Sequence, residues 1–169
     1  MNVILCGMMG AGKTTVGRAL AEKSGRELVD TDGLIEEKYG KISDIFAEYG
    51  EEYFRRLETQ TAEFLSGVDG LIVSVGGGLV LREENVKFLK KNGLIVYLRA
   101  TLETLAARLQ ADETRPLLKN AESGLKERLK NLLNARAEIY ENCADFAVDV
   151  DGKTPIQVAE EILARIGEK

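Results

Sequence analysis

The residues best suited to chemistry begin at position 7, with the stretch GMMGAGKTT over residues 7–15. Gly7, Gly12, Lys13 and Thr14 have the spacing of a phosphate-binding loop, and the loop stands between an apolar run and a helix-forming one, as that motif requires. Glycines let successive backbone N–H groups point at an anion, and the following helix adds its positive N-terminal end. The stretch therefore predicts a polyphosphate site, with Lys13 on the β- and γ-phosphates and Thr14 on Mg²⁺. The alternative is a glycine-rich turn with a solvated Lys13.

Two carboxylates follow the second apolar run, in the stretch VDTDG. The carboxyl ends of parallel strands line the ligand crevice of α/β folds, so we expect Asp30 and Asp32 near the phosphate loop. Side chains two apart in an extended segment point the same way. Alternatively, Asp32 belongs to a turn and caps a helix over 34–39, and Asp30 with Gly33 fits the D-x-x-G spacing of GTPases.

Arg136 occupies a position that helical periodicity assigns to a buried face. The apolar stripe of its helix comprises Leu125, Leu129, Leu132/Leu133, Ile139/Tyr140 and Cys143. A buried guanidinium needs an anionic partner, because burying it unpaired is costly. That partner is either a structural carboxylate or a bound anionic substrate.

Arg55 lies just off another apolar stripe, within two helical pieces over 43–65 that are hinged at Gly50. We expect the stripe to contain Phe54, Leu57, Thr61 and Phe64. Arg55 either serves a ligand or pairs with Glu58 or Thr59 on a solvated face.

The third apolar run ends in SVGGG, residues 74–78. Three glycines at the end of a strand allow the backbone to approach a ligand closely, although an ordinary glycine-rich turn has the same sequence.

Five apolar runs are predicted strands, and helical patterns separate them. The runs are 3–5, 27–29, 71–75, 94–98 and 146–148. The middle runs are continuously apolar, which is typical of parallel strands covered on both faces. The pattern also predicts a helix over 102–110 capped by Thr101, a helix starting at Thr154-Pro155, and a mobile surface loop over 110–124.

Length and composition favour one globular α/β domain. The chain has 169 residues, a net charge of −5, two cysteines and no histidine. The negative charge disfavours nucleic acid or an anionic membrane as the main partner, and two cysteines suggest a reducing cytosol. We see no signal peptide or membrane span. Without histidine, acid–base chemistry falls to Asp, Glu, Lys, Tyr or water.

The chain resembles the shikimate kinase family over nearly its whole length, because six sequence elements of that family occur here in the same order and at suitable separations. These elements are the phosphate loop at 7–15, Asp30-Thr31-Asp32, Phe54-Arg55, Gly76-Gly77-Gly78, Arg115-Pro116-Leu117-Leu118, and Arg136 with Tyr140 in an R-x-x-x-Y element.

The resemblance implies a single kinase domain over 1–169, with a substrate-binding region at 33–61 and a lid at 110–124. Its fold would be a five-stranded parallel sheet flanked by helices on both faces, of the nucleoside-monophosphate-kinase type. The implied reaction moves the γ-phosphoryl of ATP to the 3-hydroxyl of shikimate, in aromatic amino-acid biosynthesis. A cytoplasmic monomer is also implied, whose partners are small molecules.

The resemblance also implies site residues. Catalytic roles fall to Lys13, Asp32 and Arg115. ATP-binding roles fall to Gly10, Ala11, Gly12, Lys13, Thr14, Thr15, Arg108, Arg115, Lys153 and Pro155. Substrate-binding roles fall to Asp32, Phe46, Phe54, Arg55, Gly76, Gly77, Gly78 and Arg136. Thr14 would bind Mg²⁺ directly, and Asp30 and Ser74 would do so through water.

The chain departs from the family at the adenine site, where Gly152-Lys153 replaces a common arginine pair; Arg108 and Pro155 are the expected adenine neighbours. Other interpretations remain: a related kinase such as a gluconate kinase, a GTP-binding switch, or a kinase-like fold without catalysis. A switch lacks its N-K-x-D signature here, since Asn142-Cys143-Ala144-Asp145 has no lysine.

Overall fold

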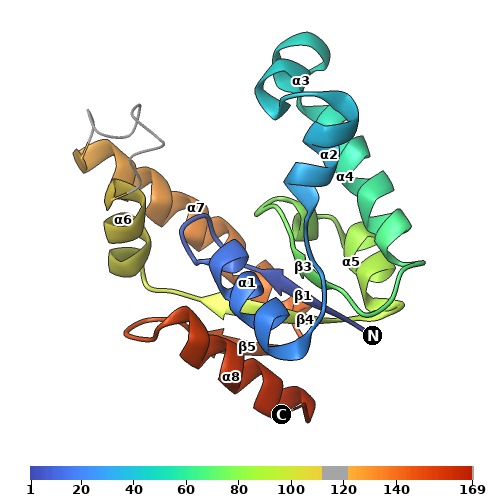
Figure 1. Cartoon of the computed structure of the whole chain (residues 1–169). Helices are drawn as coiled ribbons and strands as arrows, with labels where there is room; N and C mark the ends of the chain where they lie inside the picture. Colours follow the sequence, from blue (N-terminus) through green and yellow to red (C-terminus); the bar gives the residue numbers. More distant parts are fainter. Residues whose placement is uncertain (112–121, 169) are drawn as a thin grey trace.

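The computed structural model describes residues 1–111 and 122–168 (Figure 1). Five parallel strands form one sheet in the order β2-β3-β1-β4-β5. The strands are β1 (Asn2–Cys6), β2 (Leu28–Asp30), β3 (Ile72–Ser74), β4 (Gly93–Arg99) and β5 (Phe146–Asp149). All five predicted strands are confirmed, with ends that differ by at most one residue. The register pairs Asp30 with Ser74 and Leu5 with Ser74, so the ends of three strands meet at one edge.

Helices connect the strands and cover both faces of the sheet. They are α1 (Lys13–Ser24), α2 (Thr31–Tyr39), α3 (Ile42–Tyr49), α4 (Glu51–Leu65), α5 (Glu83–Lys90), α6 (Leu102–Ala111), α7 (Glu122–Cys143) and α8 (Pro155–Ile166), with a short 3₁₀ turn at Leu79–Leu81. Helices α1 and α8 pack together on one face, and α5 and α7 pack on the other (Figure 1). Within the described residues, no helix is long and apolar enough to span a membrane.

Helix ends follow their capping residues. Thr101 Oγ1 accepts a hydrogen bond from Thr104 N at 3.3 Å, and Thr154 forms a capping box with Gln157, so both predicted helix starts are confirmed. The helix predicted over 34–39 begins earlier, at Thr31. Its cap is Asp30, whose carboxylate accepts from Asp32 N and Gly33 N, so the capping role considered for Asp32 was wrong.

The prediction of a loop over 110–124 was wrong at both ends. Residues 110 and 111 complete α6 and residues 122–124 start α7; positions 112–121, including Arg115, lie outside the described residues. The two helical pieces hinged at Gly50 are confirmed as α3 and α4, and Gly50 has a φ of 80° that favours glycine.

Two predicted members of apolar stripes are exposed. Phe64 is 63% exposed and Ile139 is 37% exposed. The buried faces run through Phe54 in α4 and Leu129 in α7. Each exposed residue is ten positions further on, which at 3.6 residues per turn leaves it about 80° from its stripe.

The buried apolar side chains of the described residues form two hydrophobic cores. The larger surrounds the sheet, from β1 and β4 outward to α1, α7 and α8. The smaller contains Ile35, Ile45, Phe54 and Leu57, and holds α2, α3 and α4 together beyond the carboxyl edge of the sheet (Figure 1). The molecule thus consists of a sheet layer and a small helical unit, which we call the α2–α4 unit.

Candidate active site

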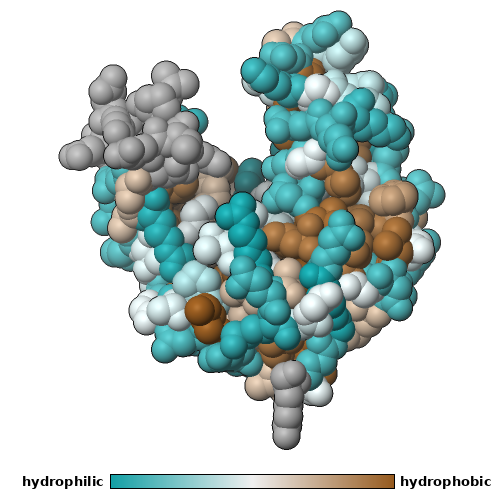
Figure 2. Space-filling model, in the orientation of Figure 1, coloured by the Kyte–Doolittle hydropathy of each residue, from teal (hydrophilic) through white to brown (hydrophobic). Residues whose placement is uncertain are grey.

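A cleft of about 760 Å³ lies between the carboxyl edge of the sheet and the α2–α4 unit. Figure 2 shows the surface hollowed between this unit and the side that carries α6. The lining includes the following predicted site residues: Gly10, Gly12, Lys13, Thr14, Thr15, Asp30, Asp32, Phe54, Arg55, Ser74, Gly76, Gly77, Gly78, Arg108 and Arg136. Residues from six separate segments therefore meet in one cleft.

Three of the remaining predicted residues lie next to this cleft. Ala11, Lys153 and Pro155 line an adjoining cavity of about 230 Å³, together with Arg108. Phe46 is not among the cleft's lining residues; its ring packs on Phe54 at 4.9 Å and remains 37% exposed. Phe46 therefore packs against a residue that lines the cleft.

The phosphate loop has the backbone that its glycines permit. Gly7, Gly10 and Gly12 have φ values of 140°, 83° and 90°. A Cβ on Gly7 would lie 2.7 Å from the Leu98 carbonyl oxygen, so only glycine fits there. Lys13 Nζ donates to the carbonyl oxygens of Gly7 at 2.9 Å and Met8 at 3.0 Å. The ammonium is thus held over the loop whose N–H groups would receive phosphate.

Three oxygen-bearing side chains converge beside the loop. Thr14 Oγ1 donates to Asp30 Oδ2 at 3.2 Å and lies 3.3 Å from Ser74 Oγ. Mg²⁺ prefers oxygen ligands and keeps several waters, so two hydroxyls and one carboxylate fit it. The described residues contain no cluster of three or more His, Cys, Asp or Glu that would form a dedicated metal site.

Asp32 lies in the first turn of α2 and faces Gly76, where a Cβ would come within 2.6 Å of its Oδ1. Burial raises the pKa of the Asp32 carboxyl above its ordinary value, and the nearby charge of Asp30 raises it further. Lys13 and Arg55 oppose this pKa shift. Asp32 therefore lies within electrostatic reach of both the phosphate loop and the arginine side of the cleft.

Arg55 both pairs with carboxylates and lines the cleft. Its Nη1 donates to Glu58 Oε2 at 2.7 Å, and its Nη2 donates to Glu51 Oε1 at 3.1 Å. The predicted Glu58 partner is confirmed, but the face is not solvated, because Glu58 is only 1% exposed. Burial raises the pKa of Glu58, and Arg55 opposes that rise. The buried carboxylate fixes the guanidinium at the wall of the cleft.

Arg136 is half-buried at the same wall, as its helical position predicted. Its Nη1 lies 3.7 Å from the place where a Cβ on Gly77 would stand. Among the described residues no carboxylate forms an ion pair with Arg136. Of the two partners predicted for it, this arrangement favours a bound anion over a structural carboxylate.

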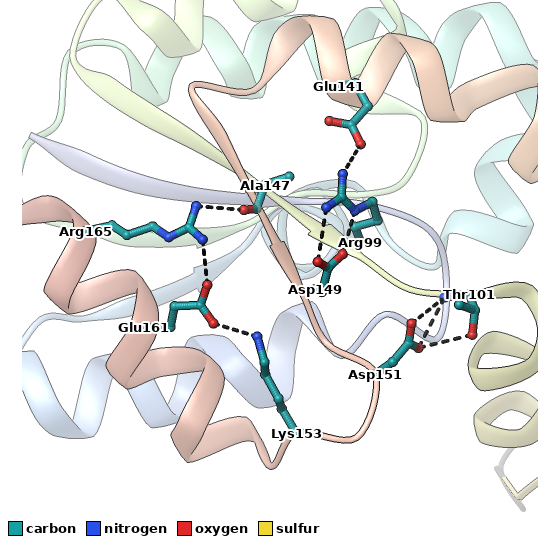
Figure 3. A network of polar contacts seen from close by, with 9 residues as sticks. All are labelled: Arg99, Thr101, Glu141, Ala147, Asp149, Asp151, Lys153, Glu161 and Arg165. Carbon is teal, nitrogen blue, oxygen red and sulfur yellow. Dashed lines mark hydrogen bonds and ion pairs between the residues drawn. The ribbon is translucent and has the colours of Figure 1, made fainter.

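Arg108 joins the phosphate loop to the start of the 150–154 segment. Its Nη1 donates to the Ala11 carbonyl oxygen at 3.0 Å, and its Nη2 donates to that of Val150 at 3.5 Å. Lys153 also lines the adjoining cavity. Its Nζ donates to Glu161 Oε2 at 2.6 Å, and Glu161 also accepts from Arg165 (Figure 3). Lys153 thus presents a neutralised ammonium at this cavity.

The sequence reasoning missed the role of Thr31. Its side chain is fully buried, and its Oγ1 accepts a hydrogen bond from Gly76 N at 3.0 Å. The hydroxyl thereby ties the glycine segment to α2. The only signal was its position between the two aspartates.

The fold is a five-stranded parallel sheet with a phosphate-binding loop. Beside the loop lie oxygens suited to Mg²⁺ and a pocket lined by arginines. Together these features define a P-loop kinase that acts on small molecules. The family model of shikimate kinase matches residues 9–167. The chain belongs to the shikimate kinase family.

Individual relatives agree with this assignment. The chain is 46% identical over 166 residues to a shikimate kinase of Sulfurihydrogenibium sp. (strain YO3AOP1), covering 98% of this chain and 97% of that protein. It is 44% identical over 164 residues to that of Caldicellulosiruptor bescii, covering 96% and 94%. The solved shikimate kinase of Acinetobacter baumannii in complex with shikimate matches with a TM-score of 0.86 at 38% identity, covering 98% of this chain and 92% of that one.

Proposed function

We propose that this protein transfers the γ-phosphoryl group of ATP to the 3-hydroxyl of shikimate, giving shikimate 3-phosphate and ADP for aromatic amino-acid biosynthesis. One observation supports the proposal above all: Lys13, Asp32, Arg55 and Arg136 line one and the same cleft. Such a cleft suits a nucleotide phosphate on one side and a compact hydroxy acid on the other.

The nucleotide half of the site binds and orients ATP. The N–H groups of Gly10 to Thr15 receive the phosphates, and Lys13 places its charge on the β- and γ-groups. Arg108, Lys153 and Pro155 border the cavity that we assign to adenine. Thr14, Asp30 and Ser74 would hold Mg²⁺, which when bound neutralises charge on the β- and γ-phosphate oxygens.

The acid half positions the acceptor. Planar guanidinium groups bind carboxylates with two parallel hydrogen bonds, so Arg55 and Arg136 suit the shikimate carboxylate. Asp32 accepts a hydrogen bond from the 3-hydroxyl and orients its oxygen toward the γ-phosphorus. As that oxygen attacks, its proton passes to Asp32, whose raised pKa suits proton acceptance.

Phosphoryl transfer depends mainly on positioning and charge stabilisation. The two halves of the cleft together supply both. Arg115 lies outside the described residues. Its proposed part, stabilising the transferred group and excluding water, rests on the family resemblance alone.

The decisive experiment measures ADP release by the purified protein with Mg·ATP and shikimate, quinate or gluconate in parallel reactions. We expect turnover with shikimate and little with gluconate. Lys13→Ala serves as the inactive control, with turnover reduced about a thousandfold or more. Turnover of gluconate without turnover of shikimate would overturn the assignment.

A further inference from the structure

Tyr140 is a buried residue to which the reaction proposed above gives no role. It is fully buried in α7, one helical turn after Arg136, although a tyrosine hydroxyl in an apolar core is costly unless it is hydrogen-bonded. Its Oη donates to the Gly77 carbonyl oxygen at 2.7 Å and lies 4.0 Å from Met8 Sδ. One hydroxyl therefore contacts both the glycine segment and the phosphate loop.

Arg136 belongs to the same cluster. A Cβ on Gly77 would lie 3.5 Å from Tyr140 Oη, 3.6 Å from the Gly7 carbonyl oxygen and 3.7 Å from Arg136 Nη1. Burial raises the pKa of Tyr140, whereas the charge of Arg136 and its hydrogen bond to the hydroxyl lower it. The phenol is therefore neutral at ordinary pH, and its single proton is given to Gly77 while its oxygen faces the guanidinium.

The glycine segment has no side chains with which to fix its own position. Two hydroxyls from different helices hold it: Thr31 of α2 accepts from Gly76 N, and Tyr140 of α7 donates to the Gly77 carbonyl oxygen. The segment lies against Arg55 and Asp32 as well, because a Cβ on Gly78 or on Gly76 would collide with them. A shift of this backbone would therefore change the shape of the acid half of the cleft.

We infer that Tyr140 is a positioning residue for the acidic substrate: its hydroxyl fixes Gly77 and the Arg136 guanidinium relative to each other, at the boundary with the phosphate loop. The inference rests on the proposed function, and it assigns no contact between Tyr140 and the substrate. The nucleotide half retains its own supports, since Lys13 and Arg108 hold the loop carbonyls independently of Tyr140.

The test compares Tyr140→Phe with Tyr97→Phe. Tyr97 is a matched control because its ring stacks on that of Tyr140 at 5.2 Å, it is only 2% exposed, and its hydroxyl makes no hydrogen bond to another described residue. Each variant loses one hydroxyl from the same aromatic pair. Steady-state kinetics, shikimate titration calorimetry and thermal unfolding are measured on both.

For Tyr140→Phe we expect KM and Kd for shikimate to rise about tenfold, the order expected from one lost buried hydrogen bond. KM for ATP should stay within about twofold of the parent. For Tyr97→Phe both constants should stay near parental values. Thr31→Val, which removes the other side-chain hydrogen bond to the glycine segment, should reproduce the selective effect of Tyr140→Phe.

Parallel rises in both KM values, equal effects of the two tyrosine variants, or a lower melting temperature with unchanged shikimate affinity would each overturn the inference and leave Tyr140 a core residue. A parental enzyme that does not turn over shikimate at all would instead refute the proposed function, so the two failures are distinguishable.

Discussion

At the residue scale, the two arginines of the cleft wall differ in how they are held. Arg55 is fixed by two carboxylates on its own helix, whereas Arg136 has no carboxylate partner among the described residues and lies beside Tyr140 and Gly77. A cation with unused hydrogen-bonding capacity in a partly desolvated place binds an anion more strongly than a neutralised one. Arg136 is therefore the stronger candidate for the main carboxylate anchor.

Arg136→Lys should keep the charge but lose the planar fork, and so weaken shikimate binding by about 1.5–3 kcal/mol. Mg·ATP affinity should barely change. Calorimetric titration with each ligand measures both effects, and Arg128→Lys, on the exposed face of the same helix, is the control. An intact shikimate affinity, or an equal loss for both ligands, would make Arg136 a structural residue.

We expect the buried carboxylate of Asp32 to be needed for activity and at the same time to lower the stability of the fold. Its pKa is raised in the folded protein, mainly by burial, so its ionised form destabilises the fold at pH values above that pKa. Asp32→Asn should therefore abolish turnover and yet raise the melting temperature at pH 7, by on the order of 2–4 °C. The gain should shrink as the pH falls through the raised pKa, because the parental carboxyl then becomes neutral too.

Thermal unfolding of Asp32→Asn and the parent between pH 4 and 8 measures this difference, with the exposed carboxylate variant Glu127→Gln as the control. If Asp32→Asn were less stable than the parent at pH 7, or if the difference did not depend on pH, the ionised Asp32 carboxylate would not be destabilising the fold.

At the element scale, the 76–78 segment shows why glycines end β3. Gly78 has φ −94° and ψ −17°, which any residue can adopt, so backbone conformation does not require glycine there. Space does: a Cβ would lie 2.2 Å from Arg55 Nη1 and 2.9 Å from its Cζ. Arg55 cannot easily give way, because Glu51 and Glu58 hold it.

Gly78→Ala should consequently displace Arg55 and weaken shikimate binding about tenfold, with little change in stability or ATP affinity. Gly67→Ala is the matched control, since a Cβ there makes only an ordinary contact of 3.6 Å with the Phe64 carbonyl oxygen. Unchanged shikimate affinity in Gly78→Ala would show that Arg55 is not needed in its observed position.

The elements were the most predictable part of the molecule. Continuous apolar runs located the strands, and Thr101 and Thr154 marked helix starts, because these signals are local in sequence. Phe64 and Ile139 were wrongly assigned to buried faces, because a helix position ten residues further along has rotated about 80° away from the first one. The hydrogen bonds of Thr31 to Gly76 and of Tyr140 to Gly77 join residues 45 and 63 positions apart. A local sequence pattern cannot predict such contacts.

At the scale of the whole molecule, the two cores suggest that the acid half of the site has its own source of stability. The smaller core contains Ile35, Ile45, Phe54 and Leu57, and Phe54 and Leu57 belong to the helix that carries Arg55. The phosphate loop belongs instead to the larger core, through buried Met8 and Ala11. Damage to the smaller core should therefore affect one ligand and spare the other.

Ile45→Ala tests this separation. Ile45 is 2% exposed, and truncating a buried isoleucine to alanine lowers the free energy of unfolding by about 2–5 kcal/mol. Because the smaller core has only four buried residues, we expect such a loss to loosen the packing of the α2–α4 unit. We expect amide hydrogen exchange to accelerate over residues 31–65 while β1 and β4 keep their protection, and shikimate affinity to fall at least tenfold while ATP still binds.

Ile162→Ala, the same change at a fully buried position of the larger core, is the matched control and should accelerate exchange throughout the chain. The comparison matters because α2 contacts β2 and α4 packs on α5, which contacts β4. Cooperative unfolding of the whole chain is therefore the competing expectation. If Ile45→Ala accelerated exchange equally in β1, β4 and residues 31–65, the two cores would form one cooperative unit. The 33–61 region would then lack independent stability as a substrate-binding part of the molecule.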